Sequence, residues 1–386
     1  MRYALFVNVG ITCYPTYGGS GIVATELGME LAARGHEVHF ITYANPIRLD
    51  PDTPRIHYHE VEVSNYPLFQ YPPYDLALAS RMAEVAESYS LDLLHVHYAI
   101  PHSIAALLAQ QMLAASQRLP FITTLHGTDI TLVGVDRSYF PITKFSIEKS
   151  NGITSISEYL RRQTLEVFGV PNEIRVIENF VNCDLYHPDN EKDGARQYAP
   201  AGQKLLIHLS NFRPVKRALD CVRILAAVRK SVPARLLMVG DGPDRGPAEH
   251  LARELKVEHD VLFLGKQNHV ERLIALAHVL LMPSDLESFG LVALEAMACG
   301  VVPVATRVGG VPELITDGQD GFLETPGDID AMAARVVALL NDEQLHYRMA
   351  KAGRWNASER FCSDKIIPQY EKYYEEVVQG ARARAL

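Results

Sequence analysis

Two cationic side chains, Arg213 and Lys216, have the residue types and spacing that point most directly to chemistry. They lie in the stretch 211–217, which follows a short apolar segment and contains Pro214, a residue suited to the first turn of a helix. One helical turn apart, a planar guanidinium and an ammonium can both reach one anion, and this pairing suits a diphosphate. Cations are unfavourable at a helix N-terminus in isolation, so the pattern favours a bound anion; the alternative is a pair of solvated surface charges.

Two glutamates, Glu287 and Glu295, form a second candidate group on either side of a predicted loop-to-helix junction. They are separated by seven residues, which begin with Ser288, Phe289 and Gly290. Glu295 would lie in an otherwise apolar helix, where an unpaired buried carboxylate is costly, so it needs hydroxyl or cation partners such as those of a ribose or a sugar. The alternative is that Glu287 interacts only with the helix dipole and that Glu295 lies on an exposed helix face.

Two further motifs follow predicted strands in the N-terminal half. The glycine-rich turn at 18–21 precedes a predicted helix, whose N-terminal N–H groups favour an anion; alternatively it is a tight turn without a ligand. His126 and Gly127 follow the predicted strand 121–125, which places the histidine for a binding cleft unless it merely caps a turn. Asp129 is a candidate cap of the next turn.

Metal binding is not expected from the sequence. The two Asp-x-Asp pairs, at 50–52 and 328–330, are more typical of loops and helix caps than of a metal site. We expect His95 and His97, on one predicted strand, to face opposite sides of the sheet and therefore not to share a metal.

The elements that must position these residues are short apolar strands that alternate with amphipathic helices. Predicted strands are 4–9, 38–43, 93–97, 121–125 and 153–156, then 204–210, 235–240, 261–264, 279–282 and 301–305. This alternation predicts an α/β fold with two doubly wound, Rossmann-like parallel sheets. The expected domains are 1–182, a polar linker at 183–203, a second domain at 204–361, and a C-terminal helix at 362–386 that crosses back to the first. Ligands of such sheets bind at the carboxyl ends of the strands, so we expect a cleft between the domains.

Composition narrows the class of protein further. The chain has 386 residues and a net charge of −9, which argues against an electrostatic nucleic-acid binder. Five widely spread cysteines without a C-x-x-C pair favour a reducing compartment and a fold without disulfide staples. No signal peptide or transmembrane segment is expected, and the predicted location is the cytoplasm.

Taken together, these motifs resemble glycosyltransferase family 4, the retaining nucleotide-sugar transferases with a GT-B fold of two Rossmann-like domains around a central cleft. Segments 10–21, 71–76, 97–102 and 123–131 are similar to one branch of that family. The resemblance implies transfer of N-acetylglucosamine from UDP-N-acetylglucosamine to the hydroxyl of L-malate, the first step of bacillithiol biosynthesis. It also implies no metal or other cofactor, no membrane or nucleic-acid partner, and a possible homo-oligomer.

The resemblance assigns donor roles to residues of this chain. Arg213 and Lys216 would hold the diphosphate and stabilise the leaving group, with a backbone N–H of Gly19. Glu295 would bind the ribose hydroxyls, and Glu287 with the backbone of 288–290 would bind the sugar.

It also assigns residues near the reacting atoms. His126 would lie over the sugar close to the reacting carbon. The candidates for binding malate are Ser20, Tyr98, Thr124 and Lys144. Other readings are a family 4 enzyme with another acceptor, an enzyme like UDP-N-acetylglucosamine 2-epimerase, and a non-catalytic nucleotide-sugar binding module.

Overall fold

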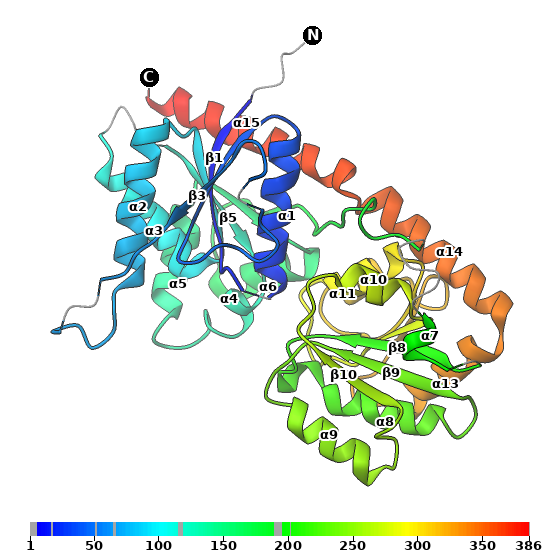
Figure 1. Ribbon diagram of the computed structural model, residues 1–386. Coiled ribbons are helices and arrows are strands. Elements are labelled where there is room, and N and C mark those ends of the chain that lie inside the picture. Colours follow the sequence, from blue (N-terminus) through cyan, green and yellow to red (C-terminus); the bar gives the residue numbers. More distant parts are fainter. Residues whose placement is uncertain are drawn as a thin grey trace. The chain divides into compact units, whose positions relative to one another are not determined.

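The computed structural model describes residues 6–16, 18–50, 52–64, 67–114, 119–188, 195–200 and 202–385. The chain folds into two compact units, each built on one parallel sheet (Figure 1). The first unit contains the chain up to Glu178 together with Ile366 onward, and the second contains Asn179–Lys365. The predicted linker at 183–203 includes residues 189–194 and 201, which lie outside the described residues, and a short helix α7 (Ala195–Tyr198).

The sheet of the first unit has seven strands in the order β3-β2-β1-β4-β5-β6-β7. In chain order the strands are β1 (Asn8–Thr12), β2 (Glu37–Thr42), β3 (Ile56–Glu60), β4 (Leu93–His97), β5 (Phe121–Leu125), β6 (Gly152–Ser155) and β7 (Arg175–Val176). The central strands β4 and β5 are buried along their whole length, as expected for a parallel sheet covered on both faces. The strand order reverses between β1 and β4, so the loops after these strands diverge at that point.

Helices cover both faces of this sheet, and the last helix of the chain is one of them. The helices of the first unit are α1 (Gly19–Ala33), α2 (Tyr74–Tyr89), α3 (Ile104–Met112), α4 (Thr128–Thr131), α5 (Phe140–Lys149), α6 (Glu158–Phe168) and most of α15 (Ser363–Ala385). Buried tyrosines fix α15 against the sheet: the hydroxyl of Tyr374 lies 2.6 Å from Nδ1 of His95, and that of Tyr373 accepts from the N–H of Ile153 at 2.9 Å.

The sheet of the second unit has six strands in the order β10-β9-β8-β11-β12-β13. They are β8 (Lys204–Leu209), β9 (Ala234–Val239), β10 (Val261–Gly265), β11 (Val279–Met282), β12 (Val302–Thr306) and β13 (Phe322–Glu324). The helices are α8 (Ala218–Val228), α9 (Arg245–Glu254), α10 (Val270–Ala275), α11 (Leu291–Ala298), α12 (Val311–Leu314), α13 (Ile329–Asn341) and α14 (Glu343–Arg360). The main core packs the apolar faces of α8 and α13 against β8, β9, β11 and β12. The expected fold class, two doubly wound parallel sheets, is confirmed.

Some element boundaries differ from the predicted ones for local reasons. The first strand lies at Asn8–Thr12 instead of 4–9, because it is these later residues that pair with β2 and β4; residues 4 and 5 lie outside the described part. Helix α8 begins only at Ala218, because Arg217 has a positive φ of 51° that separates it from the turn at Pro214. Strands β3, β7 and β13 were missed; all three lie at sheet edges, and β7 and β13 have only two and three residues.

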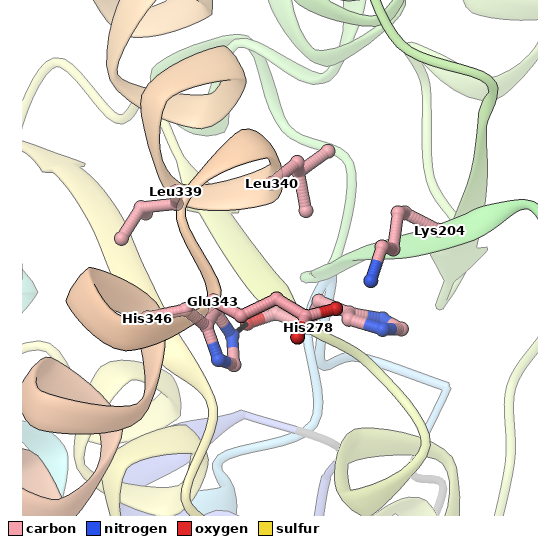
Figure 2. Close-up of a pocket in the computed structure, with 6 residues that line it drawn as sticks. All are labelled: Lys204, His278, Leu339, Leu340, Glu343 and His346. Atoms are coloured by element: carbon pink, nitrogen blue, oxygen red, sulfur yellow. Dashed lines mark hydrogen bonds between the residues drawn. The ribbon is translucent and has the colours of Figure 1, made fainter.

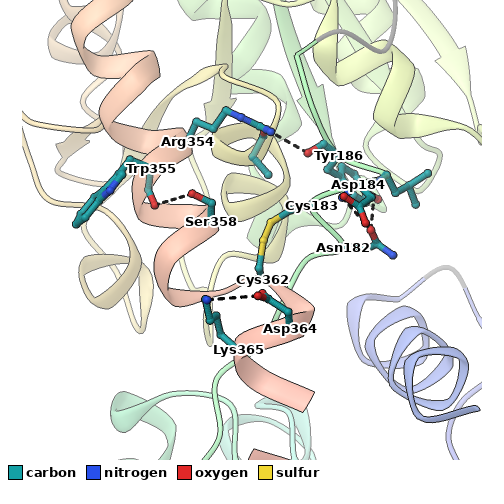
Figure 3. Close-up of a disulfide and its surroundings, with 12 residues drawn as sticks. Asn182, Cys183, Asp184, Tyr186, Arg354, Trp355, Ser358, Cys362, Asp364 and Lys365 are labelled. Atoms are coloured by element: carbon teal, nitrogen blue, oxygen red, sulfur yellow. Dashed lines mark hydrogen bonds and ion pairs between the residues drawn. A yellow bond between two sulfur atoms is a disulfide. The ribbon is translucent and has the colours of Figure 1, made fainter. Parts of the chain in front are cut away.

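The expectation of a fold without disulfide staples was wrong. Cys183 and Cys362 form a disulfide in the second unit, with Cα atoms 5.8 Å apart (Figure 3). The two cysteines are 179 residues apart in the sequence, so spacing alone gave no signal. Two backbone hydrogen bonds bring their segments together: Val181 N–H donates to Phe361 O at 2.9 Å, and Ser363 N–H donates to Val181 O at 3.0 Å.

Candidate active site

The first group of candidate residues lies at the switch point of the second sheet. β8 and β11 are neighbours, whereas β9 lies on the other side of β8. The chain therefore continues in opposite directions after β8 and after β11, and the loops that follow these two strands begin side by side. These loops, 210–217 and 283–290, carry the cationic pair and Glu287. They contact each other through a backbone hydrogen bond from Asp285 N–H to Val215 O of 2.8 Å. The strand order therefore brings both motifs to one edge of the second sheet.

Lys216 and Glu287 form the centre of this group. Nζ of Lys216 donates to Oε1 of Glu287 at 2.7 Å, and the same oxygen accepts from Oγ of Ser284 at 2.8 Å. The Lys216 side chain is 26% exposed and that of Glu287 14%, so both are accessible but partly shielded from solvent. Beside them, burial lowers the pKa of His208 to about 4, with a smaller contribution from Lys216, so this imidazole is neutral near pH 7.

Arg213 reaches this edge of the sheet from a turn and not from a helix. Residues Pro214–Lys216 form a single tight 3₁₀ turn, closed by a bond from Lys216 N–H to Arg213 O of 2.8 Å. Pro214 and the one-turn spacing of Arg213 and Lys216 are as expected, but the helix they begin is a 3₁₀ turn, and α8 begins only at Ala218. Arg213 is exposed, and among the described residues it has no ion-pair partner.

An ion pair that the sequence analysis missed fixes the two loops to each other. The guanidinium of Arg217 binds Asp285 at 3.0 Å and Asp220 at 2.5 Å. Asp220 is almost fully buried, so it anchors Arg217 to helix α8, and Arg217 in turn holds the loop that carries Glu287. In the sequence, the signal for these ion pairs was that Arg217 directly follows Lys216 and that Asp285 lies two residues before Glu287.

Two glycine turns pack directly against the loops 210–217 and 283–290, which we call the site loops. A Cβ on Gly242 would lie 2.0 Å from the carbonyl oxygen of Asn211, and one on Gly310 would lie 2.3 Å from that of Ser288. Gly310 also donates its N–H to Glu287 O at 3.0 Å. These turns follow β9 and β12, so four strand ends contribute to one site.

The remaining residues of the 287–295 motif have structural partners. Phe289 is buried against Phe361, and Gly290 is the N-cap residue of α11, with a φ of 95°. Glu295 lies in α11, 4% exposed, and Oε1 accepts a hydrogen bond from the hydroxyl of Tyr186 at 2.8 Å. The predicted need of Glu295 for a hydroxyl partner is met here by tyrosine, which the sequence analysis did not identify.

A second group lies at the switch point of the first sheet. Ser20, in the first turn of α1, donates its hydroxyl to Oη of Tyr98 at 3.3 Å, and Tyr98 Oη lies 2.9 Å from Oγ1 of Thr128. Gly19 is the first residue of the same helix, and Tyr17 lies outside the described residues. Tyr98 adopts a φ of 87°, which directs the backbone away from the strand. We call Ser20, Tyr98 and Thr128 the hydroxyl cluster.

His126 stands next to the hydroxyl cluster. Its ring stacks on that of Tyr98, with centroids 5.5 Å apart, and its Nε2 lies 2.8 Å from Nδ1 of His97. Asp129 holds the backbone of this turn, because its carboxylate accepts from the N–H groups of His126, Gly127 and Ala99 at 2.8 to 3.2 Å. Asp129 therefore fixes the turn that precedes it and does not cap α4, which has no side-chain cap, so the expected cap of the next turn is not observed.

The structure does not bring Thr124 or Lys144 to the hydroxyl cluster. Thr124 lies within β5, is fully buried, and bonds His95 Nε2 and Thr154 Oγ1, both at 2.6 Å. Lys144 Nζ pairs with Glu148 at 2.9 Å and also donates to the carbonyl of Phe168 at the end of α6.

The expectation about His95 and His97 was also wrong. Side chains two residues apart on a strand lie on the same face, and their ring centroids are 4.5 Å apart. Both nitrogens of His95 lie within 2.6 Å of hydroxyls, those of Tyr374 and Thr124.

Comparison with known proteins agrees with this arrangement. Residues 17–185 match the family model described as Glycosyltransferase Family 4, and residues 189–355 match that of Glycosyl transferases group 1. The N-acetyl-alpha-D-glucosaminyl L-malate synthase of Bacillus anthracis is 48% identical over 374 residues, which cover 97% of this chain and 98% of that protein. The chain belongs to glycosyltransferase family 4.

Solved structures show that this family 4 glycosyltransferase has the GT-B fold. A glycosyltransferase from Rickettsia africae ESF-5 superposes with a TM-score of 0.81 at 21% identity, over 97% of this chain and 99% of that one. Anabaena HepE in complex with UDP and glucose gives 0.80 at 20% identity, over 96% and 99%.

A separate hollow in the second unit lies away from the loops that carry Lys216 and Glu287. It has a volume of about 230 Å³ and is lined by Lys204, His278, Leu339, Leu340, Glu343 and His346 (Figure 2). Lys204 begins β8 and His278 immediately precedes β11, so the hollow is at the amino ends of these strands. It therefore lies at the opposite edge of the sheet from the motifs of the glycosyltransferase.

The described part of the chain contains no group of three His, Cys, Asp or Glu side chains that could hold a metal ion. Within the same residues, no helix has both the length and the apolar character needed to cross a membrane.

Proposed function

We propose that this family 4 glycosyltransferase moves N-acetylglucosamine from UDP-N-acetylglucosamine to the hydroxyl of L-malate, the first step of bacillithiol biosynthesis. The observation that carries the proposal is the 48% identity, over 97% of the chain, to a protein named for that product. Since the donor and acceptor are both polar metabolites, we place the enzyme in the cytoplasm.

The second unit holds the donor in this proposal. Arg213 and Lys216 bind the diphosphate, and Glu287 binds hydroxyls of the sugar together with the backbone of 288–290. Support comes from the 2.7 Å contact between Lys216 and Glu287, which places an ammonium and a hydroxyl-binding carboxylate side by side. Glu295 serves the ribose through a network that includes the hydroxyl of Tyr186, 2.8 Å away.

The first unit holds the acceptor and the reacting end of the sugar. A backbone N–H of Gly19 at the start of α1 contacts a phosphate, because the N-terminus of a helix favours an anion. His126 lies over the sugar. The hydroxyl cluster binds malate. It keeps Ser20 and Tyr98 from the residues expected to do so, whereas Thr124 and Lys144 have partners elsewhere.

The reaction is a front-face displacement with retained configuration. The bond from the anomeric carbon to the diphosphate oxygen breaks, the bond to the malate oxygen forms, and the malate hydroxyl proton passes to the departing diphosphate. Negative charge grows on the diphosphate as the first bond breaks, so Arg213 and Lys216 stabilise the transition state more than the ground state. These cations supply the positive charge that a metal ion provides in other transferases.

An acceptor series tests the choice of malate. Malate is a dianion, and a net charge of −9 repels it at long range, so its pocket must offer local donors. Loss of one carboxylate leaves buried donors unpaired at about 1–3 kcal/mol each, so kcat/KM for lactate should be at least about tenfold below that for malate. Glycerol should be poorer still. Equal kcat/KM for lactate and malate would contradict dicarboxylate selection and favour a family 4 enzyme with another acceptor.

A further inference from the structure

The hydrogen bond between His97 and His126 has a chemical consequence, because both rings are neutral. Burial lowers the pKa of His126 to about 3 and that of His97 well below its ordinary value, with neighbouring histidines adding to the effect. Each neutral imidazole has one N–H and one acceptor nitrogen. In the 2.8 Å contact one ring therefore donates its N–H and the other accepts it. The direction of this bond fixes which nitrogen of His126 carries its own proton.

The surroundings of His97 indicate the direction. His97 lies at the end of β4 with no exposed surface, and its Nε2 is buried without a hydrogen-bond partner among the described residues. If Nδ1 of His97 accepted, its proton would be on Nε2, as a buried N–H without an acceptor. Orphaned N–H groups are rarer in folded proteins than acceptors without a donor, so His97 donates from Nδ1.

The proton of His126 is then on Nδ1. Its Nε2 accepts from His97, and Nδ1 has no hydrogen bond to a described residue. The ring itself is held by its hydrogen bond to His97 and by stacking on Tyr98 at 5.5 Å, and the backbone is held by Asp129. We propose that His97 is a positioning residue that keeps His126 as an Nδ1–H donor toward an oxygen of the bound sugar or acceptor.

This inference rests on the proposed function for its catalytic consequence, but the tautomer can be measured without substrate. Nitrogen-15 NMR of the full chain labelled at histidine, with the His126 signals assigned from a His126→Gln variant, distinguishes the two tautomers. We expect Nδ1 protonated and Nε2 unprotonated. A spectrum with His126 protonated at Nε2 would overturn the proposal, whether or not the chain transfers sugar to malate.

Two substitutions of His97 separate the hydrogen bond from packing. His97→Leu removes the donor, whereas His97→Asn keeps an amide N–H at the same distance from Cα as Nδ1. Both lose the ring, so the difference between them reports the hydrogen bond. We expect His97→Leu to lower kcat about ten- to a hundredfold with little change in KM for UDP-N-acetylglucosamine, because misplaced groups cost rates of this order.

The Asn variant should recover most of the loss and keep the Nδ1–H spectrum of His126. Equal kcat for the Leu and Asn variants would overturn the positioning role. If the Leu variant fails to fold, the Asn variant still decides the matter: an Nε2–H spectrum in the Asn variant, or a kcat as low as that of His126→Gln, would contradict the proposal. His250→Gln, an exposed histidine of the second unit, serves as the control and should leave kcat unchanged.

Discussion

Among single residues, Lys216 carries the largest share of the proposed chemistry. Its ammonium contacts Glu287 at 2.7 Å without substrate, and in the proposed reaction it faces the charge that develops on the diphosphate. We expect Lys216→Ala to lower kcat by about a hundredfold or more, because one preorganised donor to a developing oxyanion typically contributes that much. Steady-state kinetics with UDP-N-acetylglucosamine as the varied substrate measure this effect.

Lys230→Ala is the matched control, because Lys230 is an exposed lysine of the same unit, and it should leave kcat unchanged. A Lys216→Ala enzyme with an unchanged kcat and only a raised KM for the donor would show that Lys216 merely binds the donor.

Among the elements, the two glycine turns let the turns after β9 and β12 pack closely against the site loops. Gly310 has ordinary backbone angles, yet a Cβ there would lie 2.3 Å from the carbonyl oxygen of Ser288. We expect Gly310→Ala to displace the loop that carries Glu287 and to lower kcat/KM for the donor by about tenfold to a hundredfold. Gly246→Ala, where a Cβ meets nothing within 4 Å, should have no effect. Equal activity of the two variants would argue that the turn after β12 does not shape the site.

The histidines buried in the first sheet determine how the free energy of unfolding depends on pH. Burial lowers the pKa of His95 to about 3, whereas an unfolded histidine titrates near 6.5. The unfolded chain therefore takes up protons first, and the free energy of unfolding falls as the pH drops from about 6.5 toward 3. Each such histidine adds a slope of up to about 1.4 kcal/mol per pH unit in that range.

Urea titrations followed by circular dichroism at pH 7, 6 and 5 measure this slope. His95→Gln should make it shallower, and His250→Gln, an exposed position, should leave it unchanged. A slope that is the same in all three proteins would contradict the assignment of His95 as a buried neutral ring.

The sequence predicted the strands better than the turns between them. β5 is a continuous run of apolar and β-branched residues, and β4 combines Leu and Val with two buried histidines; the predicted bounds of both strands agree with the structure. Arg217 at positive φ, the Cys183–Cys362 pair and the Glu295–Tyr186 bond depend on contacts between distant segments. Thr124 was misplaced for the same reason: the resemblance assigned its hydroxyl to malate, but partners on neighbouring strands bond that hydroxyl.

For the whole molecule, the proposed function assigns the positive charge of the donor site to side chains. If Arg213 and Lys216 supply it at the switch point of the second sheet, turnover should survive exhaustive chelation. Rates of UDP release should agree within about twofold with and without EDTA, a margin far smaller than the loss expected from removing one cation. Turnover that disappears in EDTA and returns with magnesium or manganese would show that the cationic pair is insufficient.

The central claim is that the two units together transfer N-acetylglucosamine to malate. The most direct measurement incubates the full chain with UDP-N-acetylglucosamine, with and without L-malate, and quantifies UDP alongside the mass and anomeric proton NMR of the sugar product. The account predicts one N-acetylglucosaminyl-malate with retained α configuration for each UDP released, and negligible UDP without malate. UDP release at the same rate without malate, with free sugar as the product, would contradict it and would favour an enzyme of the 2-epimerase type.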